Sequence, residues 1–150
     1  KDVKVEVLHP EENIIIPENV VPEDNAYILN DNSVVLKLTY KKNTFLLTGD
    51  LYREGESLLV KNWGSMLDAD LIKVPHHGAG TSSSKELVDA VTPKISVVIH
   101  NMFGTLEVYE RYQRAGSKVL VTGLDGNILV TSDGENLNYI TERDRKGSLK

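Results

Sequence analysis

Two short apolar runs in this chain each end abruptly at polar residues, and this pattern constrains the fold more than any other feature. Phe45–Leu47 leads into Gly49-Asp50, and Leu71–Val74 leads into His76-His77-Gly78. Short apolar runs bounded by glycine or proline are typical of buried strands. In open α/β sheets, ligand sites lie at the carboxyl ends of such strands. We therefore expect a carboxylate at one strand end and a pair of imidazoles at another, which are ligand types for zinc, manganese or iron.

Each half of this pattern also has a purely structural explanation. Gly-Asp is common in turns, so Asp50 alone would be expected to close a hairpin or cap a helix. A histidine pair at a strand end is often one buried ring and one exposed ring. Their occurrence on consecutive strands favours a metal site that contains Asp50 with His76, His77 or both. The other histidines are weaker candidates, because His9 precedes a proline and His100 is expected simply to end a strand.

The remaining pattern alternates strands and helices in the middle of the chain and places strands next to one another at both ends. This order predicts an α/β domain with a mixed β-sheet flanked by helices. Strands are predicted at 3–8, 33–40, 44–48, 71–74, 95–99, 119–121, 128–131 and 137–140. Helices are predicted at 54–63, 84–91 and 106–115. Residues 11–29 are expected to form a surface loop and residues 142–150 a frayed tail.

The segment after the histidine pair is rich in glycine and serine. Gly78 and the following small residues allow the backbone to approach a ligand closely. Ser82-Ser83-Ser84 then precede a predicted helix, and Ser83 with Glu86 forms a capping-box pattern. The serine run is therefore expected to cap that helix rather than to supply a nucleophile, because no acid–base partner lies beside it in the sequence.

Composition excludes several classes of protein. A chain of 150 residues is long enough to bury a core without disulfides, and it has no cysteine for a disulfide framework or a thiolate metal site. The net charge of −5 argues against a broad nonspecific nucleic-acid surface. No apolar run approaches the ~20 residues that a membrane span requires. Because the chain begins with Lys1, we expect it to be a piece of something longer.

Several stretches in order resemble the metallo-β-lactamase superfamily, and more closely the hydrolase domain of ComEC-type DNA-uptake (competence) proteins. They are Asn32–Leu36, Phe45–Leu51, Asp70–Gly78 and Ser82–Ser84. The resemblance covers most of the chain but only the second half of the family's domain. It implies an αβ/βα sandwich with a metal centre, usually of two metals, between two similar halves. Residues 1–150 would then be the C-terminal part of such a domain.

The resemblance also implies roles for individual residues. Asp50 matches the aspartate that bridges the metals, which would be zinc or manganese, and His76-His77 matches the last histidine ligand motif. Which of the two rings binds metal stays open, and Asp50 with His77 would be the catalytic residues. Gly78 and Ser82–Ser84 match the loop that lies near the substrate.

Two features of the family are missing from this chain. The main ligand signature, His-x-His-x-Asp-His, occurs nowhere in it, and Thr105 stands where the ComEC-type pattern has a histidine. Alone, the chain is therefore expected to bind metal weakly or not at all and to be inactive. The expected partners are the missing N-terminal half of the domain, a phosphodiester substrate such as DNA, and a second copy through an exposed apolar face.

The resemblance thus implies part of a metal-dependent phosphodiesterase or nuclease. The alternative is a non-catalytic or degenerate half-domain that serves interaction or assembly. The compartment follows from the parent: extracytoplasmic if the chain belongs to a ComEC-type membrane protein, and cytoplasmic if it belongs to a stand-alone relative.

Overall fold

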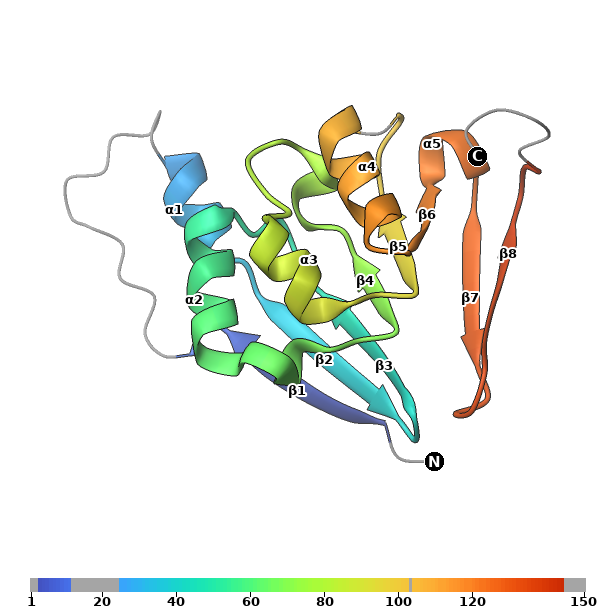
Figure 1. Cartoon of the computed structure of the whole chain (residues 1–150), viewed down its shortest axis with the longest axis horizontal. Coiled ribbons are helices and arrows are strands. Elements are labelled where there is room, and N and C mark those ends of the chain that lie inside the picture. The colour runs from blue at the N-terminus through green and yellow to red at the C-terminus, as the bar shows by residue number, and fades with distance from the viewer. Residues whose placement is uncertain (1–2, 12–24, 103, 145–150) are drawn as a thin grey trace.

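The structure, a computed structural model, describes residues 3–11, 25–102 and 104–144 (Figure 1). The strands are β1 (Lys4–His9), β2 (Val35–Tyr40), β3 (Asn43–Leu47), β4 (Leu71–Lys73), β5 (Ile95–Val98), β6 (Lys118–Val121), β7 (Ile128–Ser132) and β8 (Leu137–Thr141). The helices are α1 (Asn25–Asp31), α2 (Arg53–Trp63), α3 (Lys85–Val91), α4 (Leu106–Arg114) and α5 (Thr122–Asp125), with single 3₁₀ turns η2 (Gly64–Leu67) and η3 (Pro75–Gly78).

Six strands form one mixed sheet in the order β1-β2-β3-β4-β5-β6. The strand β2 pairs antiparallel with both β1 and β3, and a tight turn at Lys41-Lys42 joins it directly to β3. The strands β3 to β6 are parallel, and a helix lies in each connection between them, as parallel pairing requires. The predicted mixed sheet flanked by helices is therefore confirmed. This topology places the carboxyl ends of β3, β4 and β5 side by side.

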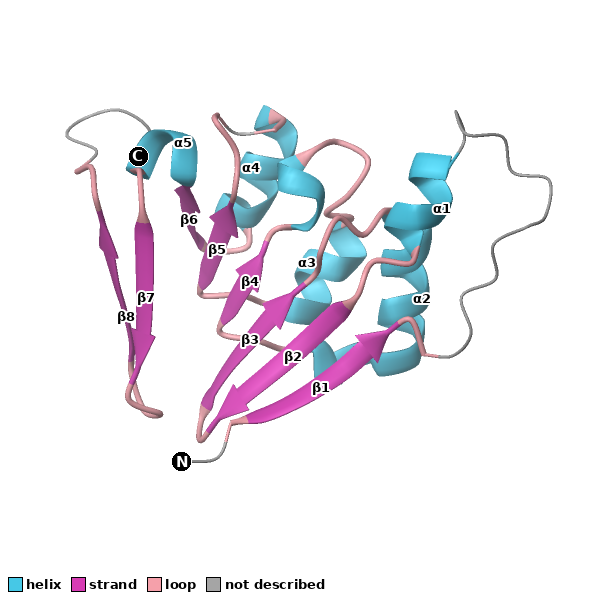
Figure 2. Cartoon of the chain, turned by 180° about the vertical axis from the view of Figure 1, so that it is seen from behind, coloured by secondary structure: helices cyan, strands magenta, loops and turns pink. Residues whose placement is uncertain are grey.

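The main hydrophobic core lies between this sheet and the helices that cover one of its faces (Figure 2). Alternation along β3 explains the orientation of the sheet: Leu46 is fully buried toward the helices, while Phe45 packs on the other side. The helices contribute Leu59 from α2, Leu87, Val88 and Val91 from α3, and Val108, Tyr109 and Tyr112 from α4. Each large buried side chain of this kind stabilises the fold by about 1.5–3 kcal/mol.

The opposite face of the sheet is only partly covered. The hairpin β7–β8 packs on β4 to β6 through a second cluster, formed by Leu71, Ile95 and Leu120 with Ile128 and Val130. Further along the same face, β1 presents two valines to solvent, Val5 with 56% and Val7 with 60% exposure. These valines pair across the sheet with Leu38 and Leu36 of β2. The result is an apolar strand surface, here called the β1–β2 face, that lies beside the hairpin.

The loop expected at 11–29 can be compared with the structure only at residue 11 and at residues 25–29, because residues 12–24 lie outside the described ranges. From Asn25 onwards the chain is helical, so the prediction was wrong at that end. The reason is tertiary: the Asp31 carboxylate accepts a hydrogen bond from the backbone N–H of Gly55 (2.9 Å), and the carbonyl of Asp31 lies 2.6 Å from Nε2 of His9. These contacts hold α1 against α2 and against the end of β1, and a local sequence pattern does not reveal them.

The first residues of the tail that was expected to be frayed, 142–150, are held by backbone hydrogen bonds. Backbone N–H groups of Glu142 and Arg143 donate to the carbonyls of Asn127 and Asp125 (2.9 Å each). The rest of that segment, residues 145–150, lies outside the description. Among the helices of the described ranges, none is long and apolar enough to cross a membrane.

Candidate metal centre

A sharp turn at the end of β3 fixes the position of Asp50. Gly49 has φ of +54°, and a Cβ there would lie 2.9 Å from the Cβ of Ser33, so only glycine fits without strain. The Ser33 hydroxyl accepts a hydrogen bond from the backbone N–H of Asp50 (3.1 Å). The carboxylate is thereby held at the carboxyl end of the strand, where a ligand site is expected.

The histidine pair lies in η3, directly after β4, in a strained backbone conformation. His76 has φ of 43° and His77 has φ of 54°, both in the left-handed region. Each such residue costs about 1–3 kcal/mol, and residues of this kind cluster at functional sites. Two backbone hydrogen bonds stabilise this conformation. The N–H of His76 donates to the carbonyl of Gly49 (3.4 Å), and the N–H of Ala79 donates to the carbonyl of His76 (2.9 Å).

The structure brings Asp50 and His77 together. Nε2 of His77 lies 3.4 Å from Oδ2 of Asp50, and Nδ1 of His77 lies 2.7 Å from the carbonyl oxygen of Ile99. Because a carbonyl can only accept, Nδ1 carries a proton. In the neutral ring Nε2 is then an acceptor that faces a second acceptor, the carboxylate oxygen. Both atoms therefore offer electron pairs toward the same point, which is the arrangement that a bound metal ion would need.

The residues present fit a metal ion. Two ligand atoms that each lie ~2.0–2.1 Å from a tetrahedral zinc are about 3.3–3.4 Å apart, which matches the separation of 3.4 Å between His77 and Asp50. The Ile99 carbonyl provides the outer contact that usually orients a metal-binding histidine and fixes its tautomer. Two ligands do not complete a metal shell. Within residues 3–11, 25–102 and 104–144, no group of three or more histidine, cysteine or acidic side chains is placed to hold a metal.

Lys73 is a member of this site that the sequence reasoning missed. Its Nζ donates to the carbonyl of Gly49 and to Oδ1 of Asp50 (3.1 Å), and its side chain is only 16% exposed. The signal was present, because Lys73 is the one charged residue in an otherwise apolar strand and lies three positions before His76. Lys73 therefore occupies one oxygen of Asp50 and leaves the other toward His77.

The charges around Asp50 keep it ionised. Burial by itself would raise the pKa of Asp50, but the hydrogen bond and charge of Lys73, with the nearby imidazoles, hold that pKa below its ordinary value. Since this pKa is lowered, the carboxylate contributes to folding stability at neutral pH, and that contribution is lost as pH falls through its pKa.

His76 has a different environment from its neighbour. Its Nδ1 lies 2.8 Å from the Thr81 hydroxyl, and its ring packs on the ring of Tyr52 with centroids 4.7 Å apart. Burial lowers the pKa of His76 despite the nearby charge of Asp50, so its neutral form is favoured. His100 lies at the far side of His77, with ring centroids 6.3 Å apart, although the sequence favoured no role for it.

In the expected substrate loop, Ser82 and Ser83 are buried and Ser84 is partly exposed. The Ser82 hydroxyl is buried and donates to the carbonyl of Leu51 (2.7 Å). Ser83 is fully buried, and its hydroxyl accepts a hydrogen bond from Tyr112 (3.3 Å). Ser84, and not Ser83, caps α3 by accepting from the N–H of Leu87 (3.3 Å). The hydroxyls of Ser82 and Ser83 are thus turned into the fold, where a substrate has no access.

Gly78 has a packing role that the sequence indicated only in general terms. Its carbonyl accepts hydrogen bonds from the N–H (3.0 Å) and the hydroxyl (3.4 Å) of Thr105. The same Thr105 hydroxyl caps α4 by accepting from the N–H of Val108 (3.4 Å). Thr105 therefore ties α4 to the turn that follows His77.

The buried side chain of Glu56 holds the loop that contains Ser83 and Ser84, a role that the sequence did not indicate. Both carboxylate oxygens accept backbone hydrogen bonds, one from Ser83 (2.5 Å) and one from Ser84 (2.7 Å), and the side chain is fully buried. Burial raises the pKa of Glu56 in spite of these hydrogen bonds. Through this contact α2 holds the loop that follows the histidine pair.

Replacing Glu56 by alanine is expected to lower the free energy of unfolding by about 3 kcal/mol, because two buried N–H groups lose their acceptor. Urea unfolding followed by circular dichroism measures this loss, with Glu54→Ala on the exposed side of α2 as the matched control. Because the pKa of Glu56 is raised, the contribution of Glu56 should shrink as pH rises above its ordinary value of 4.5. A loss no larger than that of the control would contradict this role.

Comparison with known proteins finds relatives that are named as recombination, competence or ComE operon proteins. No protein-family model matches the chain. It is 31% identical over 122 residues to Recombination protein 2 of Haemophilus influenzae, which is 78% of this chain and 15% of that protein. It is 30% identical over 133 residues to ComE operon protein 3 of Bacillus subtilis, which is 85% of this chain and 16% of that protein.

A third relative is Competence protein ComA of Neisseria gonorrhoeae, 34% identical over 102 residues, which cover 65% of this chain and 15% of that protein. The chain is therefore homologous to a segment of competence and recombination proteins. It spans no more than 16% of the length of any of these three relatives.

Proposed function

We propose that this chain is the second half of a metallo-β-lactamase-like domain and contributes to a metal-dependent phosphodiesterase that acts on DNA. The observation that carries this proposal is the pair of acceptors, Nε2 of His77 and Oδ2 of Asp50, 3.4 Å apart at the carboxyl ends of parallel strands. The names of two relatives, Recombination protein 2 and Competence protein ComA, support DNA as the substrate class.

The residues of this chain have distinct tasks in that reaction. Asp50 and His77 would hold the metal, zinc or manganese, of which the complete domain is expected to bind two. Lys73 fixes the orientation of Asp50, and the carbonyl of Ile99 fixes that of His77. When bound, such metal ions lower the pKa of a water and stabilise the leaving oxygen of a phosphodiester. The remaining ligands would come from a His-x-His-x-Asp-His signature in a segment outside this sequence.

The experiment is single-turnover cleavage of a labelled oligonucleotide and of a small phosphodiester by a polypeptide that carries the complete signature. We expect cleavage of both that depends on added manganese or zinc, and little or none by residues 1–150 alone. If the complete polypeptide is inert on both substrates at every metal concentration, the hydrolase proposal fails.

A second candidate, an interaction module, is favoured by the β1–β2 face. Val5 and Val7 are more than half exposed and lie next to apolar residues of β2. Apolar strand surfaces of this kind mark interaction sites. In the proposed domain the preceding half would cover this face. When that half is absent, a second copy of the chain would bind there instead.

The double variant Val5→Lys/Val7→Lys should therefore abolish self-association of the isolated chain and cost less than about 1 kcal/mol of folding stability, because both side chains are exposed. Sedimentation velocity over a range of concentrations measures this. The matched control is Leu129→Lys/Ile140→Lys, two exposed residues that face each other on the β7–β8 hairpin. Equal effects of the two double variants would show that the β1–β2 face is not the interface.

A further inference from the structure

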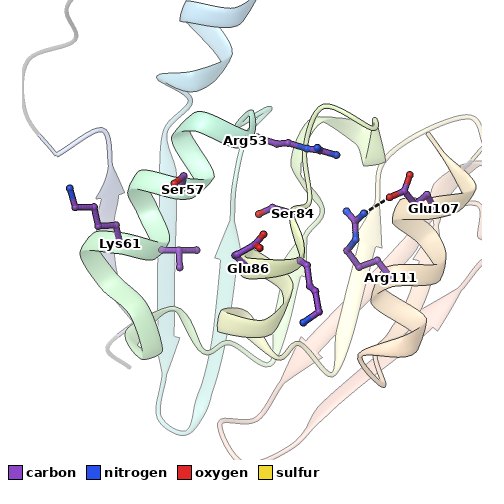
Figure 3. A pocket seen from close by; sticks show the side chains of 9 residues that line it. Arg53, Ser57, Lys61, Ser84, Glu86, Glu107 and Arg111 are labelled. Carbon is purple, nitrogen blue, oxygen red and sulfur yellow. Dashed lines mark hydrogen bonds and ion pairs between the residues drawn. The ribbon is translucent and has the colours of Figure 1, made fainter.

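A cavity of about 470 Å³ lies between α2, α3 and α4, and its charged lining differs from the rest of the molecule (Figure 3). Four cationic side chains line it, Arg53, Lys61, Lys85 and Arg111, against two acidic ones, Glu86 and Glu107. The lining is therefore positive in a chain whose net charge is −5. A local excess of this sign attracts anions even when the whole protein is acidic.

Only part of this positive charge is compensated within the fold. Arg111 pairs with Glu107 (2.6 Å), as the dashed line in Figure 3 shows, and Lys85 pairs with Asp89 outside the cavity. Across the part of the chain that the structure describes, neither Arg53 nor Lys61 forms an ion pair with a carboxylate. Arg53 and Lys61 thus keep their charges for a ligand, and Glu86 is the acidic side chain of the lining that lies outside these pairs. Lys85 pairs with the exposed Asp89 on its own helix, and an exposed pair of this kind is weak enough for a phosphate to replace the carboxylate.

The two arginines also connect the cavity to the metal centre. Arg53 donates to the carbonyl of Gly80 (2.8 Å), and Arg111 donates to the carbonyl of Ser83. Both hydrogen bonds hold the loop after the histidine pair, and neither neutralises a guanidinium, because a carbonyl carries no net charge. Gly80 lies three residues after His77, so the hydrogen bond of Arg53 ties one side of the cavity to the loop that leaves the candidate site.

We propose that this cavity binds the phosphate groups of a nucleic-acid strand next to the bond that is cleaved; this rests on the proposed function. The cations come from three separate helices, which suits an extended polyanion better than a single small ion. The aliphatic stems of the lysines and Val60 offer apolar surface to the sugars between the phosphates. Because the chain as a whole is negatively charged, the nucleic-acid strand should bind at this cavity and not elsewhere on the surface.

The test is the salt dependence of binding between residues 1–150 and a fluorescein-labelled single-stranded oligonucleotide, measured by anisotropy in EDTA. Each lost phosphate contact reduces the slope of log K against log salt by about 0.7 for a single strand. The double variant Lys61→Gln/Lys85→Gln should therefore reduce the magnitude of the slope by about 1.4 and weaken binding at least about tenfold at low salt. Both lysines are exposed, so the substitutions should preserve the circular dichroism spectrum.

The matched control is Lys41→Gln/Lys42→Gln, which removes the same charge from the turn between β2 and β3, at the end of the sheet away from this cavity (Figure 1). The control should keep the wild-type slope. Equal loss in both variants would reduce the effect to net charge and overturn the proposal. An unchanged slope in the cavity variant, or full displacement of the oligonucleotide by millimolar inorganic phosphate, would overturn it too. Because EDTA prevents hydrolysis, the outcome does not depend on whether the centre cleaves DNA.

Discussion

Replacing Asp50 by asparagine should lower phosphodiester hydrolysis by at least about a thousandfold, or about 4 kcal/mol of activation free energy, in the polypeptide that carries the complete signature. Asparagine keeps the shape of the side chain but removes the charge that would hold metal against His77 and that pairs with Lys73. The fold should remain, because the hydrogen bond of Asp50 to Ser33 uses only the backbone N–H.

Single-turnover cleavage of a labelled oligonucleotide measures this loss. Asp70→Asn is the matched control, since Asp70 also pairs with a lysine, Lys94 (2.7 Å), but lies at the amino end of β4. The control should cleave at close to the wild-type rate. An unchanged rate in the Asp50 variant would remove Asp50 from the reaction and favour the interaction module.

The two adjacent histidines should respond differently to alanine. His77→Ala removes the nitrogen that faces Asp50, so hydrolysis should fall about as far as in Asp50→Asn. His76 contacts Thr81 and Tyr52 instead, and its loss should cost about 10–100-fold, as for residues that support metal ligands. The same cleavage assay measures both rates, and circular dichroism checks the folding of each variant. A larger loss for His76 than for His77 would reverse this assignment.

Much of the fold was predictable because its elements have strong local signals. The buried run at β4, the hairpin of β2 and β3, and the helical spacing in α2 and α4 all appear in the structure within a few residues of their predicted bounds. Helix α1 was not predictable in this way. It is short and is held by contacts from His9 and Gly55, which are distant from it in the sequence.

The candidate site was predictable in outline and not in detail. The approach of Asp50 to the histidine pair follows from the parallel order of β3 and β4, which apolar runs and turn residues indicate. The choice of His77 over His76 depends on two left-handed residues in succession, which no sequence rule specifies. Lys73 and Glu56 were missed because the partner of each lies more than twenty residues away in the sequence. Locally, Lys73 is a single charge in an apolar run, and Glu56 is one of two acids in the first turn of a helix.

The burial of two of the three serines could not be predicted from their sequence context. Their place beside the histidine motif suggested contact with substrate, but the fold turns Ser82 and Ser83 inward to satisfy buried polar groups. Proximity in sequence to a reactive residue therefore does not establish access to it.

The central claim is that Oδ2 of Asp50 and Nε2 of His77 bind one metal ion. The most direct measurement is diffraction at the zinc absorption edge from crystals of this chain soaked in millimolar zinc. We expect an anomalous peak between these two atoms, within ~2.0–2.2 Å of each, with Lys73 still bound to the other oxygen of Asp50. Zinc bound to His76 or elsewhere on the surface, with no peak between Asp50 and His77, would contradict the claim.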